Sequence, residues 1–313
     1  MGGENSSPDD APGREPPRVS IILPHLNTPD LLVRALQSLI VQRIDHGWFE
    51  IIVVDNGSRM SLAPVAEAWP MVRFLSCHEP GPGPARNHGI AAARADVLAF
   101  IDADVRVLPG WLQAGLDALQ SAPGPVGGDV RIDTADPHRL SGVEAFECVF
   151  AFRQKFYIER RQFSVTANLI MTRAMFDAAG PFGGIDTNED IHFGERAHAL
   201  GIPTSYAPTM RALHPPRASF DEMRRKWQRL SVQLLGAHLD RGGSFFAWKI
   251  KALAVALSGV GHLPMMFVSP RVSGPGNRVR GAGFLLRIRI VRALDMLRQA
   301  REAIRRTGKA LLV

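Results

Sequence analysis

The chain has 313 residues, of which 46% are hydrophobic and 21% are charged. This length allows one large or two ordinary domains, and this composition is typical of globular rather than disordered proteins. The two cysteines, Cys77 and Cys148, are too few for a disulfide framework and are not spaced as metal ligands. A reducing, cytoplasmic setting is therefore expected.

The formal net charge of +7 is unevenly distributed along the chain. Between Arg271 and Lys309, eleven Lys and Arg outnumber two acids, so this segment carries +9 and the rest about −2. We therefore expect an anionic surface to meet the C-terminal segment. No nucleic-acid partner is expected, because no recognisable nucleic-acid-binding motif accompanies these basic residues.

Residues 1–17 are rich in Gly, Pro, Ser, Asp and Glu and are predicted to be a disordered leader, without the apolar core of a signal peptide. Near-continuous apolar runs follow at 19–24, 51–54, 72–75 and 97–101. Such runs are typical of strands buried on both faces of a parallel sheet. Helical patterns at 30–42 and 84–95 separate them, which predicts βαβ units and an open, mostly parallel α/β sheet.

A loop rich in glycine and proline, at 80–83, leads into the second of these predicted helices. Pro84 suits the first helical position, and Arg86 is expected in the first turn. Free backbone amides at the start of a helix attract anions. The segment is consistent with a diphosphate site, although such a loop alone is usually only a turn.

Two carboxylates, Asp102 and Asp104, follow the fourth apolar run. In an extended strand, side chains at i and i+2 point to the same face, so both acids are expected at the carboxyl end of the strand, where open α/β sheets bind ligands. Two carboxylates so close repel each other unless a cation or hydrogen-bond donors lie between them. A divalent metal that carries a diphosphate fits this pattern; the alternative is a turn with two solvated aspartates.

The order of these segments resembles that of the family 2 glycosyltransferases, which have the GT-A fold. The resemblance rests on 19–27, 50–58, 85–90, 102–104, 109–111, 166–168, 179–182, 188–190, Arg196 and His214. It implies a GT-A domain at 18–235, an open sheet flanked by helices. Residues 236–313 would then form a helical, basic and amphipathic C-terminal extension.

The resemblance also implies roles for residues near the donor. Pro24 and Asn27 follow the first strand, where this family surrounds the nucleotide base. Asp55 occupies the position of an acid that contacts the base or ribose, although the family's common second Asp is replaced here by Asn56. Arg86 matches an arginine that approaches the nucleotide.

The resemblance identifies Asp102 and Asp104 as the DXD motif. The first acid would face the ribose and the second would bind a divalent metal, Mn²⁺ or Mg²⁺. His214 matches a histidine that joins the metal or the diphosphate in many relatives, and a histidine ligand favours Mn²⁺ slightly.

Asp190 matches the catalytic base that deprotonates the acceptor hydroxyl in an inverting transfer. Without the resemblance, Glu189 and Asp190 would simply be acids in the first turn of a helix that runs to Leu200. His192 stands where relatives often have another acid, so the acceptor is less directly implied than the donor. His25 and His88 show no pairing pattern and are expected to form local hydrogen bonds.

Residues 129–165 are expected to form a variable region that faces the acceptor, because aromatic and basic side chains crowd it. The alternative is an amphipathic helix packed on the core.

Further on, 252–268 lacks formal charge but is short for a membrane span, which favours a re-entrant or interfacial segment over a buried hairpin. A basic amphipathic helix is predicted at 284–306, with one apolar side: Leu286, Ile290, Leu294, Leu297 and Ile304. Such a helix lies on an anionic membrane or docks on the enzyme.

Together these observations predict a metal-dependent, inverting glycosyltransferase. It would move one sugar from a nucleotide-sugar, UDP-linked by expectation, to a glycan or lipid-linked acceptor in cell-envelope or exopolysaccharide synthesis. We expect it in the cytoplasm, peripheral on the inner face of the cytoplasmic membrane. The alternative is a non-catalytic protein that binds nucleotide-sugars or acts as a scaffold at the membrane.

Overall fold

The computed structural model describes residues 15–185 and 187–310, so most of the predicted leader at 1–17 lies outside the described residues. The chain forms two compact units. The first comprises Met1–Arg131 and Arg153–His214, and the second comprises Ile132–Phe152 and Pro215–Val313.

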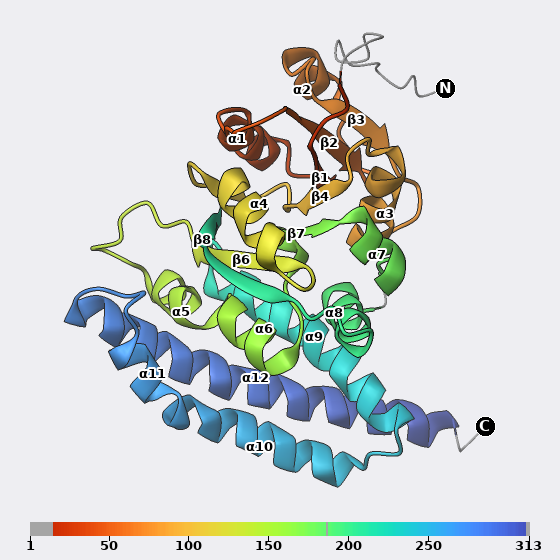
Figure 1. Cartoon of the computed structure of the whole chain (residues 1–313). Helices are drawn as coiled ribbons and strands as arrows, with labels where there is room; N and C mark the ends of the chain where they lie inside the picture. The colour runs from red at the N-terminus through yellow and green to blue at the C-terminus, as the bar shows by residue number, and fades with distance from the viewer. Residues whose placement is uncertain (1–14, 186, 311–313) are drawn as a thin grey trace. The chain divides into compact units, whose positions relative to one another are not determined.

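The first unit is built on a sheet that has eight strands among the described residues, in the order β3-β2-β1-β4-β7-β6-β8-β5 (Figure 1). The strands are β1 (Val19–His25), β2 (Phe49–Asp55), β3 (Arg73–Ser76), β4 (Val97–Phe100), β5 (Arg106–Val107), β6 (Val126–Ile132), β7 (Leu169–Thr172) and β8 (Ser205–His214). Strands β3, β2, β1 and β4 pair in parallel, whereas β4 with β7, β7 with β6, and β8 with β5 are antiparallel. The predicted α/β fold is confirmed, and its sheet is mixed.

Helices cover both faces of this sheet because the side chains of each buried strand alternate between two apolar layers. The helical segments of the unit are α1 (Pro29–Ile40), α2 (Ala63–Ala68), α3 (Pro82–Ala92), α4 (Trp111–Ser121), α6 (Gln154–Arg161), the 3₁₀ turn η2 (Thr166–Asn168), α7 (Arg173–Ala179) and α8 (Glu189–Ala199). One layer joins α1 and α4 to Ile21 and Leu23 of β1. The other joins α7 and α8 to Ile22 of β1 and Phe100 of β4.

Helix α3 begins at Pro82, two residues before the predicted start at Pro84. Proline is as well suited to the first helical position at 82 as at 84, and Gly81 ends the loop with a φ of 120°, which glycine adopts readily. Arg86 consequently lies in the second turn of the helix instead of the first.

The second unit is helical, with α5 (Gly142–Phe150), α9 (Phe220–Asp240), α10 (Phe245–Gly261), α11 (Leu263–Val268) and α12 (Pro275–Ala310). Helix α10 runs alongside α12, and α5 and α9 also pack on α12 (Figure 1). The predicted boundary after residue 235 falls inside α9, which is one continuous helix, so the unit changes at Pro215 instead. The predicted acceptor-facing region at 129–165 is likewise divided, with α5 in the second unit and α6 in the first.

Candidate active site

The acid pair lies in a turn between β4 and β5. Strand β4 ends at Phe100, and the backbone N–H of Val105 donates to the carbonyl of Asp102 at 3.0 Å, which closes the turn. The alternation of an extended strand therefore does not apply to Asp102 and Asp104, contrary to the sequence-based expectation. The two carboxylates contact different partners, Arg86 and His214.

Antiparallel pairing of β5 with β8 brings Asp104 and His214 together. The register pairs Arg106 with Leu213, so Asp104, two residues before β5, and His214, the last residue of β8, lie at the same end of the ladder. The Oδ2 atom of Asp104 lies 3.6 Å from Nε2 of His214, and both side chains are partly exposed. This pair, distant in sequence, was predicted together as a metal site.

The donor set of Asp104 and His214 suits a divalent cation. A carboxylate oxygen and an imidazole nitrogen are ligands that Mn²⁺ accepts, and 3.6 Å is too long for a direct hydrogen bond between them. Among the described residues, no group of three or more His, Cys, Asp or Glu side chains could hold a metal ion. Two protein ligands suffice where substrate phosphates complete the coordination, as at many Mg²⁺ sites.

Arg86 links two of the site's carboxylates. Its Nη2 lies 2.7 Å from Oδ1 of Asp102, and its Nη1 lies 3.0 Å from Oε1 of Glu189. The side chain is almost fully buried; burial lowers the pKa of Arg86, but the carboxylates of Asp102, Asp190 and Glu189 more than offset this and raise it. Arg86 is thus a fixed positive charge that connects the turn after β4 to the start of α8.

Asp190 lies beside this arginine, in the first turn of α8, and is half-buried. Its Oδ1 accepts a hydrogen bond from Oγ1 of Thr166 at 3.1 Å. The pKa of Asp190 is raised to about 7, chiefly by burial; Arg86 opposes the rise, Glu189 and Asp102 add to it, and the hydrogen bond from Thr166 lowers it. A carboxylate with this pKa is suited to accept a proton near neutral pH.

The loop before α8 is held against α3 by residues whose role was not predicted. The side-chain amide of Asn87 donates to the carbonyl of Phe182 and accepts from its N–H, at 2.9 and 3.0 Å. Gly83 packs so closely that an added Cβ would lie 1.9 Å from the carbonyl oxygen of Gly183. Arg196 donates to the carbonyls of Ala179, Gly180 and Pro181 and so fixes the same loop from α8.

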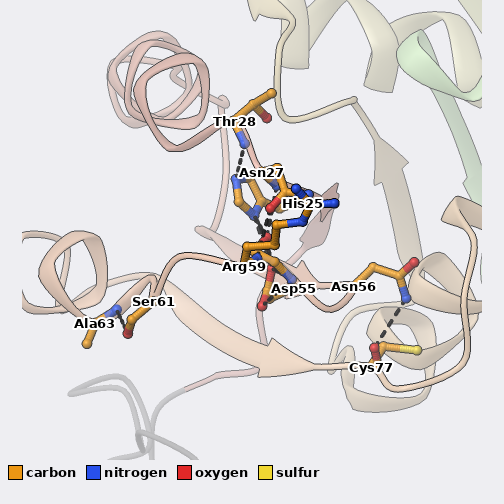
Figure 2. Close-up of polar contacts among 10 residues, drawn as sticks. His25, Asn27, Thr28, Asp55, Asn56, Arg59, Ser61, Ala63 and Cys77 are labelled. Carbon is orange, nitrogen blue, oxygen red and sulfur yellow. Dashed lines mark hydrogen bonds and ion pairs between the residues drawn. The ribbon is translucent and has the colours of Figure 1, made fainter.

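A second cluster of predicted residues lies at the carboxyl ends of β1 and β2 (Figure 2). The backbone N–H of Thr28 donates to Nε2 of buried His25 at 3.2 Å, so Nδ1 carries the proton and donates to Asp55 Oδ1, also at 3.2 Å. This confirms that His25 forms local hydrogen bonds. The Asp55 carboxylate, which also accepts from the Ser58 hydroxyl, is held in one orientation and stays partly exposed.

Asn27 joins the loop after β1 to the loop after β2. It adopts a left-handed φ of 57°, and its Oδ1 accepts from the backbone N–H of Arg59 at 2.8 Å (Figure 2). Pro24, next to the end of β1, is half-buried and pairs in register with Val54. Both residues lie at the sheet edge predicted to surround the base.

Asn56, which departs from the family pattern, has a structural reason to be an amide. Its Nδ2 donates to the carbonyls of Cys77 and Glu79, and its Oδ1 accepts from the N–H of Gly81 at 2.7 Å (Figure 2 shows the Cys77 contact). A carboxylate could not make the two donations. Asn56 therefore fixes the loop that leads into α3 and Arg86.

Sequence reasoning missed Thr166, Asn87 and Glu189 as parts of the site. Each lies inside a segment that carries the family resemblance, but only the fold shows which atoms they contact. His192 is exposed, and its Nδ1 lies 3.7 Å from Oε2 of Glu195. It lines an open pocket of about 480 Å³ with Gly183, Thr187 and Arg196, on the same helix as Asp190.

Comparison with known proteins identifies relatives of this chain. The model of glycosyl transferase family 2 matches residues 20–179, which is half of the chain. Glycosyltransferase AglE of Haloferax volcanii is 26% identical over 232 residues, which cover 72% of this chain and 76% of AglE. The succinoglycan biosynthesis protein ExoO of Rhizobium meliloti is 32% identical over 129 residues, which cover 40% of this chain and 35% of ExoO.

A similar fold occurs in the mannosyltransferase PcManGT from Pyrobaculum calidifontis, whose structure holds GDP-Man and Mn²⁺. The TM-score is 0.53 at 16% sequence identity, and the match covers 95% of this chain and 81% of that one. At this identity the likeness shows a shared GT-A fold. The curated relatives thus include a protein of succinoglycan biosynthesis, and a protein of similar fold holds GDP-Man and Mn²⁺ in its structure.

Proposed function

Because the chain belongs to glycosyl transferase family 2 and is a glycosyltransferase, we propose that it moves one sugar from a nucleotide-sugar to an acceptor hydroxyl, with inversion. The proposed donor is a UDP-sugar and the proposed acceptor a glycan or lipid-linked glycan of cell-envelope or exopolysaccharide synthesis. One observation carries the proposal: Arg86 joins the acid pair after β4 to the acids at the start of α8.

Asp190 is the proposed general base. Its pKa of about 7 lets it accept the proton as the acceptor oxygen attacks the anomeric carbon and the bond from that carbon to the diphosphate oxygen breaks. The Thr166 hydroxyl occupies Oδ1 and orients the carboxylate, so Oδ2 is the proposed proton acceptor. The leaving nucleoside diphosphate keeps the electron pair of the broken bond.

Asp104 and His214 are the proposed metal ligands, and a bound Mn²⁺ or Mg²⁺ would neutralise the charge that develops on the leaving diphosphate. Asp102 is proposed to face the ribose while Arg86 holds it in place. Pro24 and Asn27 are proposed to surround the base and Asp55 to contact the base or the ribose, since all three lie at or just after the carboxyl ends of β1 and β2. His25 supports that surface by fixing the carboxylate of Asp55.

The first experiment measures thermal stability with UDP, GDP, dTDP or CMP, each with Mn²⁺ or with EDTA. A ligand that binds only the folded state stabilises it by about 2.7 kcal/mol at a hundredfold excess over Kd. We expect UDP with Mn²⁺ to raise the Tm and Asp104→Ala to abolish the metal-dependent part. A Tm rise with another nucleotide would reassign the donor base.

The alternative, a non-catalytic scaffold that binds nucleotide-sugars, predicts a different result. A scaffold would still respond to a nucleotide, but it would not hydrolyse or transfer the sugar of a bound donor. Release of UDP from UDP-sugars, in the presence and absence of acceptor extracts, separates the two. A rise in Tm with nucleotide, together with no release of UDP that is lost in Asp190→Asn, would favour the scaffold.

A further inference from the structure

We propose that an exposed apolar face of the second unit, made by α10 and α12, binds the surface of an anionic lipid bilayer. The α10–α12 face comprises Phe246, Ile250, Leu253, Leu257 and Val260 of α10 with Ile290 and Leu294 of α12. The inference is independent of the donor and acceptor proposed above.

Helix α10 has one fully apolar exposed side. Phe246, Ile250, Leu253, Leu257 and Val260 follow one another at spacings of four, three, four and three residues, so they form one stripe along the helix. Each is more than half exposed, from 54% at Ile250 to 71% at Phe246. The buried residues Trp248, Ala252 and Gly259 lie on the other side of α10.

That buried side packs against α12. The Nε1 atom of Trp248 donates to the carbonyl of Met296 at 3.2 Å, and a Cβ on Gly259 would contact Leu286 at 3.3 Å. These contacts lie near both ends of α10, so the helix runs beside α12 over most of its length. The exposed stripe is therefore not needed for packing within the unit.

Helix α12 also exposes apolar residues, next to the side that contacts α10. It packs through Leu285, Ile288 and Met296, whereas the predicted apolar side leaves Ile290 and Leu294 at 53% and 58% exposure. Leu286 and Leu297, on the same side, contact or pack against α10. The sequence offered two alternatives for this helix, docking on the enzyme or lying on an anionic membrane. Both are compatible here, because α12 packs within the unit through one side and exposes the other.

The border of the face is positively charged. Exposed Arg287, Arg298, Arg301 and Arg305 lie one turn from the apolar residues of α12, where they outnumber exposed Glu302, and exposed Lys249 lies next to the stripe of α10. The acid Asp295 is buried and paired with Arg224 at 2.8 Å, so it does not offset this charge. An apolar stripe bordered by Arg and Lys is typical of helices that lie in the interface of anionic membranes.

A flat orientation fits these residues better than a membrane span. Phe245–Val268 is long and apolar enough to cross a membrane by composition, with 17% of its most apolar window buried. However, α10 is packed along α12, and α12 carries arginines on almost every turn, which the hydrocarbon core would not accommodate. A second copy of the chain is disfavoured because pairing two such faces would oppose their cationic borders.

The test is flotation of the full chain with vesicles of phosphatidylcholine alone or with 30% phosphatidylglycerol, in low and high salt. We expect the protein to float with the anionic vesicles and the bound fraction to fall in high salt. The variant Leu253→Glu/Leu257→Glu should lose at least tenfold in affinity, since two charges would have to enter the acyl boundary. Both positions are exposed, so the fold should be retained, and an unchanged Tm would verify this.

The matched control is Val41→Glu/Leu200→Glu, which places the same charges at equally exposed apolar positions of the first unit. This control should float like the wild type. Equal flotation of the wild type and the Leu253→Glu/Leu257→Glu variant would overturn the proposal. A second outcome would also overturn it: the wild type does not float and is dimeric by light scattering, whereas the Leu253→Glu/Leu257→Glu variant is monomeric. The face would then bind a second copy of the chain.

Discussion

The side chain of Asn87 and the backbone of Phe182 form two reciprocal hydrogen bonds, of 2.9 and 3.0 Å. They fix α3 to the loop before α8 and so set the distance between Arg86 and the acids at the start of α8. The site depends on this contact because Arg86 and Glu189, 103 residues apart, form an ion pair across it.

Substitution Asn87→Asp should weaken both the fold and catalysis. The carboxylate cannot donate to the carbonyl of Phe182 and would repel it, so we expect a loss of about 1–3 kcal/mol in the free energy of unfolding. Urea denaturation measures this loss. Because α8 would shift relative to α3, kcat should fall more than the affinity for nucleotide. Gln120→Glu, which makes the same amide-to-acid change at an exposed position of α4, is the matched control and should change neither.

Asp190→Asn should abolish transfer without weakening nucleotide binding. Removal of a general base typically costs about 10²–10⁴ in rate. The nucleotide-dependent rise in Tm should persist, since Asp190 is proposed to act on the acceptor. Glu189→Gln is the control and should retain more activity, because that residue pairs with Arg86 and does not accept the proton. Transfer by Asp190→Asn at the wild-type rate would exclude this base.

Asp190→Asn should be more stable than the wild type, and the difference should grow as pH rises. The folded-state pKa of about 7 lies above the ordinary value of 3.8, so ionisation of Asp190 costs folding free energy from about pH 4 upward, and the cost is complete above pH 7. An asparagine removes this cost. The Tm difference between Asp190→Asn and wild type should therefore grow between pH 4.5 and pH 7.5 and then level off. A difference that shrinks over this range would contradict the raised pKa.

Thr166→Val should move the pH profile of kcat/KM to higher pH. The hydroxyl of Thr166 donates to the ionised Asp190 and lowers its pKa, so its removal raises that pKa above about 7. Activity requires the ionised base, so the acidic limb of the kcat/KM profile should shift upward by a measurable fraction of a pH unit. Thr166→Ser, which keeps the hydroxyl, should restore the wild-type profile. A purely structural role would lower activity equally at all pH values.

The parallel half of the fold could be predicted from apolar runs, because buried strands carry nearly continuous hydrophobic sequence. The predicted runs at 19–24, 51–54, 72–75 and 97–101 match β1, β2, β3 and β4 within a few residues. The antiparallel half could not be predicted in this way. Strand β5 has two residues, and its pairing with β8 depends on contacts between segments about a hundred residues apart.

The candidate site shows the same limit. The types and order of the site residues indicated a family: Asp102, Asp104, Asp190 and His214. The assumption that the extended strand continues through the acid pair, however, gave a wrong side-chain arrangement. The carboxylates at 102 and 104 were expected on one strand face, yet the turn after Phe100 directs them to Arg86 and His214. Tertiary packing decides which side chains of the site form hydrogen bonds and ion pairs with one another. No local pattern in a single sequence shows these partners.

Arg86→Lys tests whether one arginine must serve two carboxylates. The planar guanidinium reaches Asp102 and Glu189 through separate nitrogen atoms, whereas a lysine ammonium is a single point charge on a flexible chain. We expect the substituted lysine to pair with one acid and leave the other uncompensated, so both metal-dependent nucleotide affinity and kcat should fall at least tenfold. The substitution also weakens the charge that lowers the pKa of Asp190, so the acidic limb of the pH profile should move upward. Arg94→Lys, at another arginine that pairs with a buried acid, Glu50, is the control and should leave the profile unchanged. If Arg86→Lys lost stability but kept the wild-type profile, Arg86 would serve the fold alone.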